Sequence, residues 1–130
     1  MRPLVMILVA ATVAACGPTN PTVDQLGLVP DYLGVQTRLL DGDLANFLVE
    51  ARGALKPGDV ENYAECAAAQ YALIRGYGFA RHVRTNVHER GGIWRGDAVY
   101  TISPALPRGV RTIDAEVVVA RCRERGIPTV

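Results

Sequence analysis

This sequence has no large excess of charge of either sign and few aromatic side chains. Its 130 residues include 14 Lys and Arg against 13 Asp and Glu, a formal net charge of +1, and 6% of them are aromatic. This balance excludes a generally basic nucleic-acid-binding protein, and so few aromatic rings cannot form a series of stacking platforms for bases. Because 49% of the residues are hydrophobic and 21% are charged, wholesale disorder is excluded as well. We expect one small folded domain that binds no nucleic acid.

Recognisable catalytic and cofactor-binding motifs are missing. The segment Gly76-Tyr77-Gly78 lacks the third glycine of a dinucleotide-binding turn, and no Walker-type loop occurs. The chain's one serine, Ser103, precedes Pro104 and lacks the glycine-flanked elbow of serine hydrolases. The sequence distinguishes no catalytic pair among the carboxylates Asp41, Asp43, Glu61, Glu65, Asp97, Asp114 and Glu116. It therefore favours a non-enzymatic role without a cofactor.

Residues that could bind a metal ion are equally few. The two histidines, His82 and His88, lie six positions apart in a segment that alternates like a β-strand. At ~3.3 Å per residue their backbones would be about 20 Å apart, which is too far to bind one ion together. Neither C-x-x-C nor H-x-x-x-H spacing occurs. We expect no metal site.

The chain begins like an exported protein. Met1-Arg2-Pro3 is followed by an apolar run from Leu4 to Ala15 that only Thr12 interrupts. This run is too short to cross a hydrocarbon layer of ~30 Å, which needs about 20 residues. A basic start, a short apolar stretch and small residues at its end are typical of a signal peptide, which we place at residues 1–15.

The end of this run resembles the lipobox of bacterial lipoproteins. In Val13-Ala14-Ala15-Cys16-Gly17, small residues precede a cysteine. The resemblance implies cleavage before Cys16, diacylglycerol on its thiol and a further acyl chain on the new amino terminus. Two or three acyl chains hold a protein firmly in a membrane, because each buried methylene contributes ~0.8 kcal/mol. The alternatives are a secreted protein cut after Ala15 and a short uncut anchor.

The resemblance also implies a cellular address. Gly17 stands where an inner-membrane retention signal would have Asp, so the expected location in a Gram-negative host is the outer membrane, facing the periplasm. As a whole, the chain resembles small uncharacterised envelope lipoproteins of alphaproteobacteria. This wider resemblance implies an address in the cell envelope and no particular activity.

A flexible tether is predicted to precede one globular domain. Residues 16–34 hold three of the eight prolines and show no periodicity, so we expect the lipidated cysteine and an extended tether there. Residues 35–130 are predicted to form a single α+β domain. In it, an alanine-rich helix and a C-terminal helix pack on a small antiparallel sheet of two β-hairpins. The hairpins are expected at residues 35–51, around Asp41-Gly42-Asp43, and at residues 79–102, around Gly91-Gly92.

The two predicted helices differ in how clearly the sequence defines them. Asp59 is expected to cap the alanine-rich helix, which ends at Gly76 or Gly78. The segment 112–125 leaves two interpretations. Its three consecutive valines favour a strand. The spacing of Ala115, Val118, Val119 and Cys122, in contrast, fits one face of a helix capped by Thr112. We predict a helix there.

The remaining two cysteines are predicted to form a disulfide. Once Cys16 is assigned to the lipid anchor, Cys66 and Cys122 are left as an even pair in an oxidising compartment. A bond across 56 residues would stabilise the fold by up to ~4 kcal/mol in the chain-entropy treatment. The alternative makes Cys66 a nucleophile with His82 or His88 as its base.

A basic stripe is the predicted contact face. Alternation along residues 79–90 places several basic side chains on one side of a strand, and a further arginine lies nearby on the next strand. Such a stripe could contact anionic lipid or an acidic envelope protein, in a manner that depends on ionic strength. The residues of this predicted face are His82, Arg84, Asn86, His88, Arg90 and Arg95.

The sequence thus predicts a lipid-anchored envelope protein with a non-enzymatic binding or structural role at the membrane surface. Two alternatives stay open at this point. One is a small periplasmic enzyme or redox protein that uses Cys66. The other is a carrier of a small anionic or lipid ligand, which would need a cavity between helix and sheet.

Overall fold

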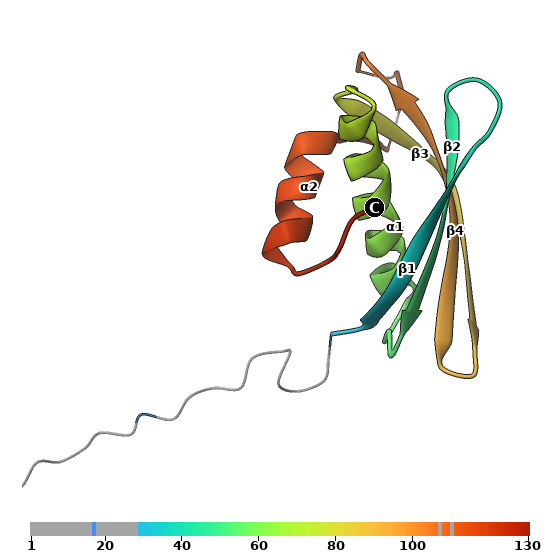
Figure 1. The fold of residues 1–130 in the computed structure, drawn as a ribbon, viewed down its shortest axis with the longest axis vertical. Helices are drawn as coiled ribbons and strands as arrows, with labels where there is room; N and C mark the ends of the chain where they lie inside the picture. The colour runs from blue at the N-terminus through green and yellow to red at the C-terminus, as the bar shows by residue number, and fades with distance from the viewer. Residues whose placement is uncertain (1–16, 18–28, 107, 110) are drawn as a thin grey trace, which may run out of the picture.

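The computed structural model describes residues 17, 29–106, 108–109 and 111–130. The five strands form one antiparallel sheet in the order β1-β2-β4-β3-β5. One face of the sheet packs against α1, and α2 lies beyond α1 (Figure 1). The predicted α+β class, its two hairpins and its two helices are confirmed. In chain order the elements are β1 (Asp31–Leu39), β2 (Leu44–Arg52), α1 (Pro57–Ile74), β3 (Phe79–Arg90), β4 (Ile93–Ser103), β5 (Thr112–Asp114) and α2 (Ala115–Glu124).

The first strand begins earlier than the sequence predicted. The predicted signal peptide and Cys16 lie outside the described residues. β1 starts at Asp31 rather than at Val35, and its first two residues pair with the end of β2. A bulge between Tyr32 and Gly34 interrupts the side-chain alternation. This irregularity concealed the first part of the strand, because alternation is the sequence signal for a half-buried strand.

The turn between β3 and β4 follows its glycines. Gly91 and Gly92 have φ angles of 60° and 80°. Two consecutive residues with positive φ are typical of a type I′ turn, whose twist matches that of the flanking strands. The turn therefore keeps β3 and β4 in one register from Arg90 opposite Ile93 back to Arg84 opposite Val99.

The start of α1 differs from the prediction by three residues. Lys56 is the N-cap and Pro57 is the first helical residue, a position where the missing N–H of proline costs nothing. Asp59 lies in the first turn instead. Its Oδ2 accepts hydrogen bonds from the backbone N–H groups of Leu55 and Lys56 at 2.9 and 3.3 Å. Asp59 thus stabilises the helix start from inside the helix. None of the helices in the described residues is long and apolar enough to cross a membrane.

The ambiguous C-terminal segment contains both a strand and a helix. Thr112–Asp114 forms β5, which pairs with the first residues of β3. The helix α2 follows directly, and its cap is Asp114, whose Oδ1 accepts from the N–H of Val117 at 3.2 Å. The predicted cap Thr112 was wrong, because that residue belongs to the sheet ladder.

Small residues let α1 lie between the sheet and α2. The helix buries five alanines, Ala64, Ala67, Ala68, Ala69 and Ala72, so both neighbours can approach it closely. On the sheet side, a Cβ built on Gly96 would lie 2.7 Å from Val60 Cγ1 and 2.9 Å from Val49 Cγ2. Only glycine fits there without displacing a side chain. The core is completed by the inward side chains of β2, namely Ala45, Phe47, Val49 and Ala51.

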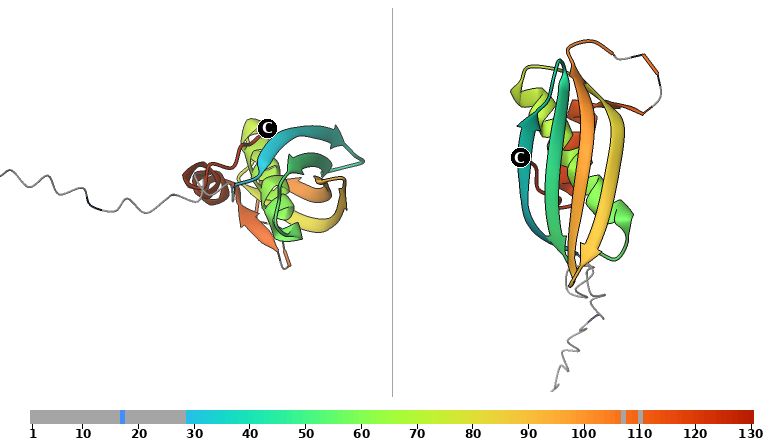
Figure 2. Two further views of the ribbon diagram at one scale, coloured as in Figure 1. Left: turned by 90° about the horizontal axis from the view of Figure 1, so that it is seen from below. Right: turned by 90° about the vertical axis from the view of Figure 1, so that its right-hand side faces the viewer.

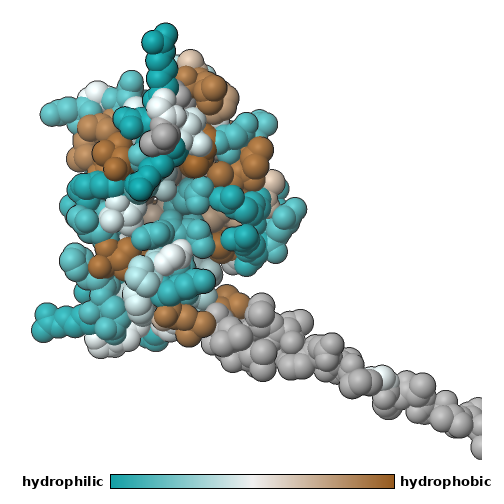
Figure 3. Space-filling view, turned by 180° about the vertical axis from the view of Figure 1, so that it is seen from behind, coloured by the Kyte–Doolittle hydropathy of each residue, from teal (hydrophilic) through white to brown (hydrophobic). Residues whose placement is uncertain are grey.

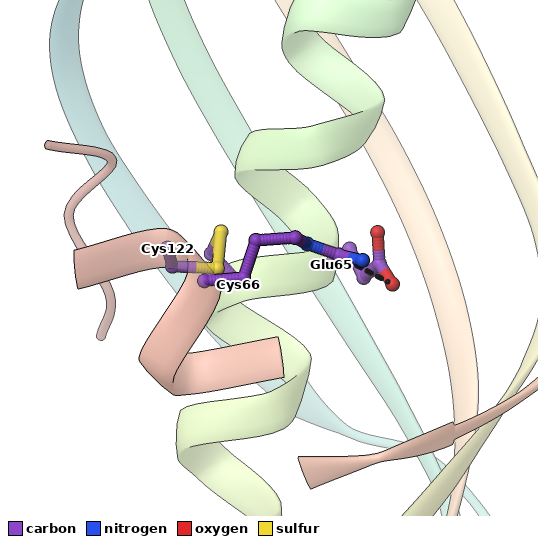
Figure 4. Close-up of a disulfide and its surroundings, with 4 residues drawn as sticks. Glu65, Cys66 and Cys122 are labelled. Carbon is purple, nitrogen blue, oxygen red and sulfur yellow. Dashed lines mark hydrogen bonds and ion pairs between the residues drawn. A yellow bond between two sulfur atoms is a disulfide. The ribbon is translucent and has the colours of Figure 1, made fainter. Parts of the chain in front are cut away.

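The predicted disulfide joins the two helices. Cys66 of α1 and Cys122 of α2 are both buried, with a Cα–Cα distance of 5.9 Å that suits an ordinary disulfide. Beside it, Arg121 forms an ion pair with Glu65 at 3.0 Å (Figure 4). In this state Cys66 has no free thiol.

Candidate functional site

A bulge in β3 divides the predicted contact face. His82 pairs with Tyr100 and Arg84 pairs with the next residue of β4, so Val83 is an extra residue in β3. An extra residue shifts the alternation of every side chain that follows. His82 therefore faces α1, whereas Arg84 and the later predicted residues face the opposite side of the sheet. The prediction that all six residues share one face was wrong at His82.

The sheet side that faces away from α1, here called the outer face, carries the other five predicted residues. They are Arg84, Asn86, His88 and Arg90 from β3 and Arg95 from β4. No helix crosses this face within the part of the chain that the structure describes (Figure 2, right). Two of the arginines have carboxylate partners. Arg84 lies 3.3 Å from Asp97, and Arg95 lies 2.9 Å from Glu50.

Hydrogen bonds join several polar side chains of the outer face around Asp97. Asn46 donates to Asp97 Oδ1 at 2.6 Å and to the backbone oxygen of Ala98 at 3.0 Å. Asp97 also accepts from Arg84. Arg38 lies on the same face, opposite Asn46 in the ladder, and donates to Gln36 at 3.1 Å. Since these groups already have partners, the outer face is a mixed-charge surface with an excess of arginine rather than a uniform basic stripe.

An apolar hollow of about 450 Å³ lies on the outer face across β1, β2 and β4. It forms where Gly34 has no side chain and no neighbouring atom within 4 Å of its Cβ position. Leu33 and Leu48 contribute apolar surface to it, and Arg95 and His88 border it. Elsewhere the exposed apolar side chains are scattered among hydrophilic ones on the side drawn in Figure 3. The hollow thus brings together apolar side chains of two neighbouring strands.

A second concavity, here called the polar cleft, opens between α1 and β3. Its volume is about 600 Å³. One wall belongs to α1, the floor to β3 and β4, and the rim to the segment that leads into β5. The lining residues are Glu61, Asn62, Glu65, His82, Val83, Arg84, Thr85, Tyr100, Arg111 and Ile113, and of these Arg84 has its charge paired with Asp97.

His82 is the centre of the polar cleft. Its Nε2 lies 2.7 Å from Thr85 Oγ1, and its Nδ1 lies 3.2 Å from a terminal nitrogen of Arg111. A guanidinium can only donate, so Nδ1 must accept, and the ring proton sits on Nε2 and is donated to Thr85. The ring also packs edge-on against Tyr100 at 5.2 Å between centroids. The imidazole is therefore held as the neutral Nε2–H form.

The surroundings of His82 also favour its neutral form. Burial and the positive charge of Arg111 lower the pKa of His82, and the carboxylates of Glu61 and Glu65 offset only part of that effect. Burial, assisted by the same two carboxylates, raises the pKa of the Tyr100 hydroxyl. Both groups are consequently uncharged near neutral pH. The floor of the cleft offers hydrogen-bonding groups without a net charge.

Arg111 is attached to His82 twice. Besides the side-chain bond, its backbone oxygen accepts from the N–H of His82 at 3.1 Å. Its φ angle of 64° lies in the left-handed region, which non-glycine residues seldom adopt. Surrounding structure must hold such a conformation, which costs roughly 1–3 kcal/mol. The guanidinium is therefore placed by a backbone that the fold has fixed.

Few of the residues that line this cleft could be identified from local sequence patterns. His82 was singled out, but for the wrong face, and the two glutamates appeared only among undistinguished carboxylates. No local sequence pattern identifies Thr85, Tyr100 and Arg111 as parts of one site, because they come together only when three distant segments fold. The spacing of Glu61 and Glu65, one helical turn apart, is equally typical of a solvated helix face. No cluster of three metal-binding side chains occurs in the described residues.

Comparison with known proteins places this chain in a family. The family model described as the YNQ4 C-terminal domain matches residues 32–126. The chain is 34% identical over 104 residues to the "Uncharacterized 26.9 kDa protein in nqo8 5'region" of Paracoccus denitrificans. This match covers 75% of the chain and 41% of the relative. It confirms the resemblance to an uncharacterised alphaproteobacterial protein.

The match spans less than half of the relative's length, and no solved structure matches the chain. The matched residues include both helices and all of the described strands apart from Asp31, the first residue of β1. The chain belongs to the YNQ4 C-terminal domain family.

Proposed function

We propose that this chain is a lipid-anchored cell-envelope protein with a non-enzymatic binding role at the membrane surface. Two features support the address. The start of the sequence resembles a lipoprotein signal that ends at Cys16, and the disulfide between Cys66 and Cys122 suits an oxidising compartment. In a Gram-negative host the anchor would place the domain on the periplasmic side of the outer membrane.

The binding role is assigned to the outer face. The observation that carries it is the apolar hollow, which is bordered by Arg95 and His88 and lies on the sheet face that no helix of the described residues covers. Arg38 and Arg90 form no ion pair with any described carboxylate, so they remain available to a partner. Arg84 and Arg95 are partly neutralised already.

The partner that fits this face is an acidic protein segment with an apolar side chain. Such a segment would place the apolar side chain in the hollow and carboxylates near Arg38 and Arg90. An anionic lipid surface fits less well, because the apolar area is recessed and two arginines are already paired with carboxylates. Complementary charge of this kind accelerates association and weakens with salt.

The address is tested by the intact mass of protein extracted from membranes after alkylation of free thiols, with and without prior reduction. We expect a mass that begins at Cys16 with added acyl chains, and no alkylation of Cys66 or Cys122 before reduction. An unlipidated mass would contradict the anchor. Alkylation without reduction would contradict the exported, disulfide-bonded state.

The outer face is tested by charge reversal. In-cell crosslinking and mass spectrometry would compare the wild type with the variant Arg38→Glu/Arg90→Glu. The control is Arg123→Glu/Arg125→Glu, which changes the net charge by the same amount but at the end of α2. We expect an acidic crosslinked protein to be lost from the first variant alone, with melting temperatures close to that of the wild type. Equal recovery from both variants would refute this assignment of the face.

A further inference from the structure

We propose that the polar cleft binds a small zwitterionic molecule, one that carries an ammonium group and a carboxylate a few bonds apart. This site lies on the helix side of the sheet and is independent of the outer face. The geometry that points to it is an unpaired carboxylate on one wall and an unpaired guanidinium on the other, with a neutral polar floor between them.

Glu61 supplies the negative wall. It is exposed on α1 and forms no ion pair with any described residue. Glu65, one turn further along the helix, is held by Arg121 of α2. Only one of the two carboxylates is therefore free to receive an ammonium group, and its negative charge reaches the cleft centre, where it acts on His82.

Arg111 supplies the positive wall. One terminal nitrogen donates to His82 Nδ1, and a guanidinium has five N–H donors in a planar fork. The remaining donors can form the paired hydrogen bonds with a carboxylate that arginine favours. No described carboxylate forms an ion pair with Arg111. The hydrogen bond to His82 Nδ1 holds the guanidinium at the rim, and the backbone bond to the His82 N–H holds the left-handed residue that carries it.

Because the floor is uncharged, the charges of Glu61 and Arg111 determine which ligands the cleft accepts. His82 and Tyr100 are both uncharged, so neither attracts or repels one end of a ligand. An anion without an ammonium group would meet the unpaired charge of Glu61, and a cation without a carboxylate would meet that of Arg111. The cleft volume of about 600 Å³ falls within the range of roughly 300–1,000 Å³ that is usual for small-molecule sites. It is large enough for an amino acid or a dipeptide.

Isothermal titration calorimetry of the full-length protein in detergent micelles tests the proposal with three matched probes. They are dialanine, N-acetyl-dialanine, which keeps only the negative end, and dialanine amide, which keeps only the positive end. We expect dialanine to bind at millimolar concentrations or below, and each blocked probe to bind at least tenfold more weakly. No binding of dialanine would overturn the proposal, as would equal binding of all three probes.

Single variants assign the two ends. Glu61→Gln and Arg111→Gln should each weaken dialanine binding at least tenfold, because each removes one charge while keeping a polar side chain of similar shape. The matched controls Glu116→Gln and Arg125→Gln change exposed residues of α2 and its C-cap and should leave binding unchanged. Melting temperatures confirm that the variants fold. Unchanged binding in Glu61→Gln and Arg111→Gln would place the ligand elsewhere and refute the site.

Discussion

At the scale of single residues, the histidine in the polar cleft makes stability depend on pH. Burial and Arg111 lower the pKa of His82 below its ordinary value of about 6.5. Between those two pKa values, the unfolded chain binds more protons than the folded one, so unfolding is favoured by acid. The contribution of His82 to stability is therefore complete above about pH 6.5 and is lost as the pH falls through the lowered value.

Urea denaturation at pH 7.5, 6.0 and 5.0 would measure this effect. The free energy of unfolding should decline with acid more steeply in the wild type than in His82→Gln, whose side chain does not titrate. Arg111→Gln should show an intermediate slope, because it removes the guanidinium and leaves the effect of burial. Identical slopes in the wild type and His82→Gln would show that His82 does not contribute.

A second prediction at this scale concerns the contact between α1 and β4. A methyl group at Gly96 would lie closer than 3.0 Å to side-chain atoms of both Val60 and Val49. Gly96→Ala should therefore reduce the free energy of unfolding by about 1–3 kcal/mol, the usual cost of overpacking. Gly78→Ala is the matched control, since its Cβ would meet nothing within 4 Å. Equal urea midpoints for both variants would contradict the close approach of the helix.

At the scale of the secondary-structure elements, the disulfide is the covalent link between α2 and α1. The C-terminal helix has ten residues and only four of them are buried, so its packing alone is modest. Cys66→Ala/Cys122→Ala should lower the free energy of unfolding by about 2–5 kcal/mol. A reductant should lower the urea midpoint of the wild type similarly and leave that of the double variant unchanged. A double variant as stable as the oxidised wild type would refute this role.

The elements also show which parts of the fold a sequence can predict. The glycine turn at Gly91-Gly92, the alternation of the flanking strands and the alanine-rich helix are local signals, and each predicted its element. The disulfide was predictable because only two cysteines remain once Cys16 is assigned to the anchor, and cysteines in an oxidising compartment usually pair. The bulge at Val83 left no local signal, and it decided which side of the sheet His82 faces.

β5 and the polar cleft were missed for a related reason. A strand of three residues is too short for alternation to be recognised, and β5 is stabilised by its pairing with β3. The left-handed conformation of Arg111 is unexpected for a residue other than glycine. Both features depend on contacts between segments distant in the sequence, which no local pattern contains.

At the scale of the whole molecule, the two proposed sites lie on opposite sides of one sheet. Side chains of a strand alternate between its faces, so beyond the bulge β3 presents Arg90 to the outer face, while His82 before it faces the cleft. Between the two faces, Phe47 and Ala98 are fully buried. Coupling between two sites requires packed side chains that can switch between two arrangements. We expect this densely packed layer to keep one arrangement, so that binding on one face does not alter the other.

The two sites should therefore act independently. Arg38→Glu/Arg90→Glu should lose the crosslinked partner and bind dialanine within about twofold of the wild type, whereas Glu61→Gln should show the reverse. In the combined variant, dialanine affinity should equal that of Glu61→Gln alone to within about 0.5 kcal/mol, as is usual for distant sites without shared partners, and partner recovery should equal that of Arg38→Glu/Arg90→Glu alone. The two assays, applied to all four proteins, measure this directly. Loss of the partner in a well-folded Glu61→Gln protein would contradict independence, since a change in the cleft would then alter binding on the opposite side of the sheet.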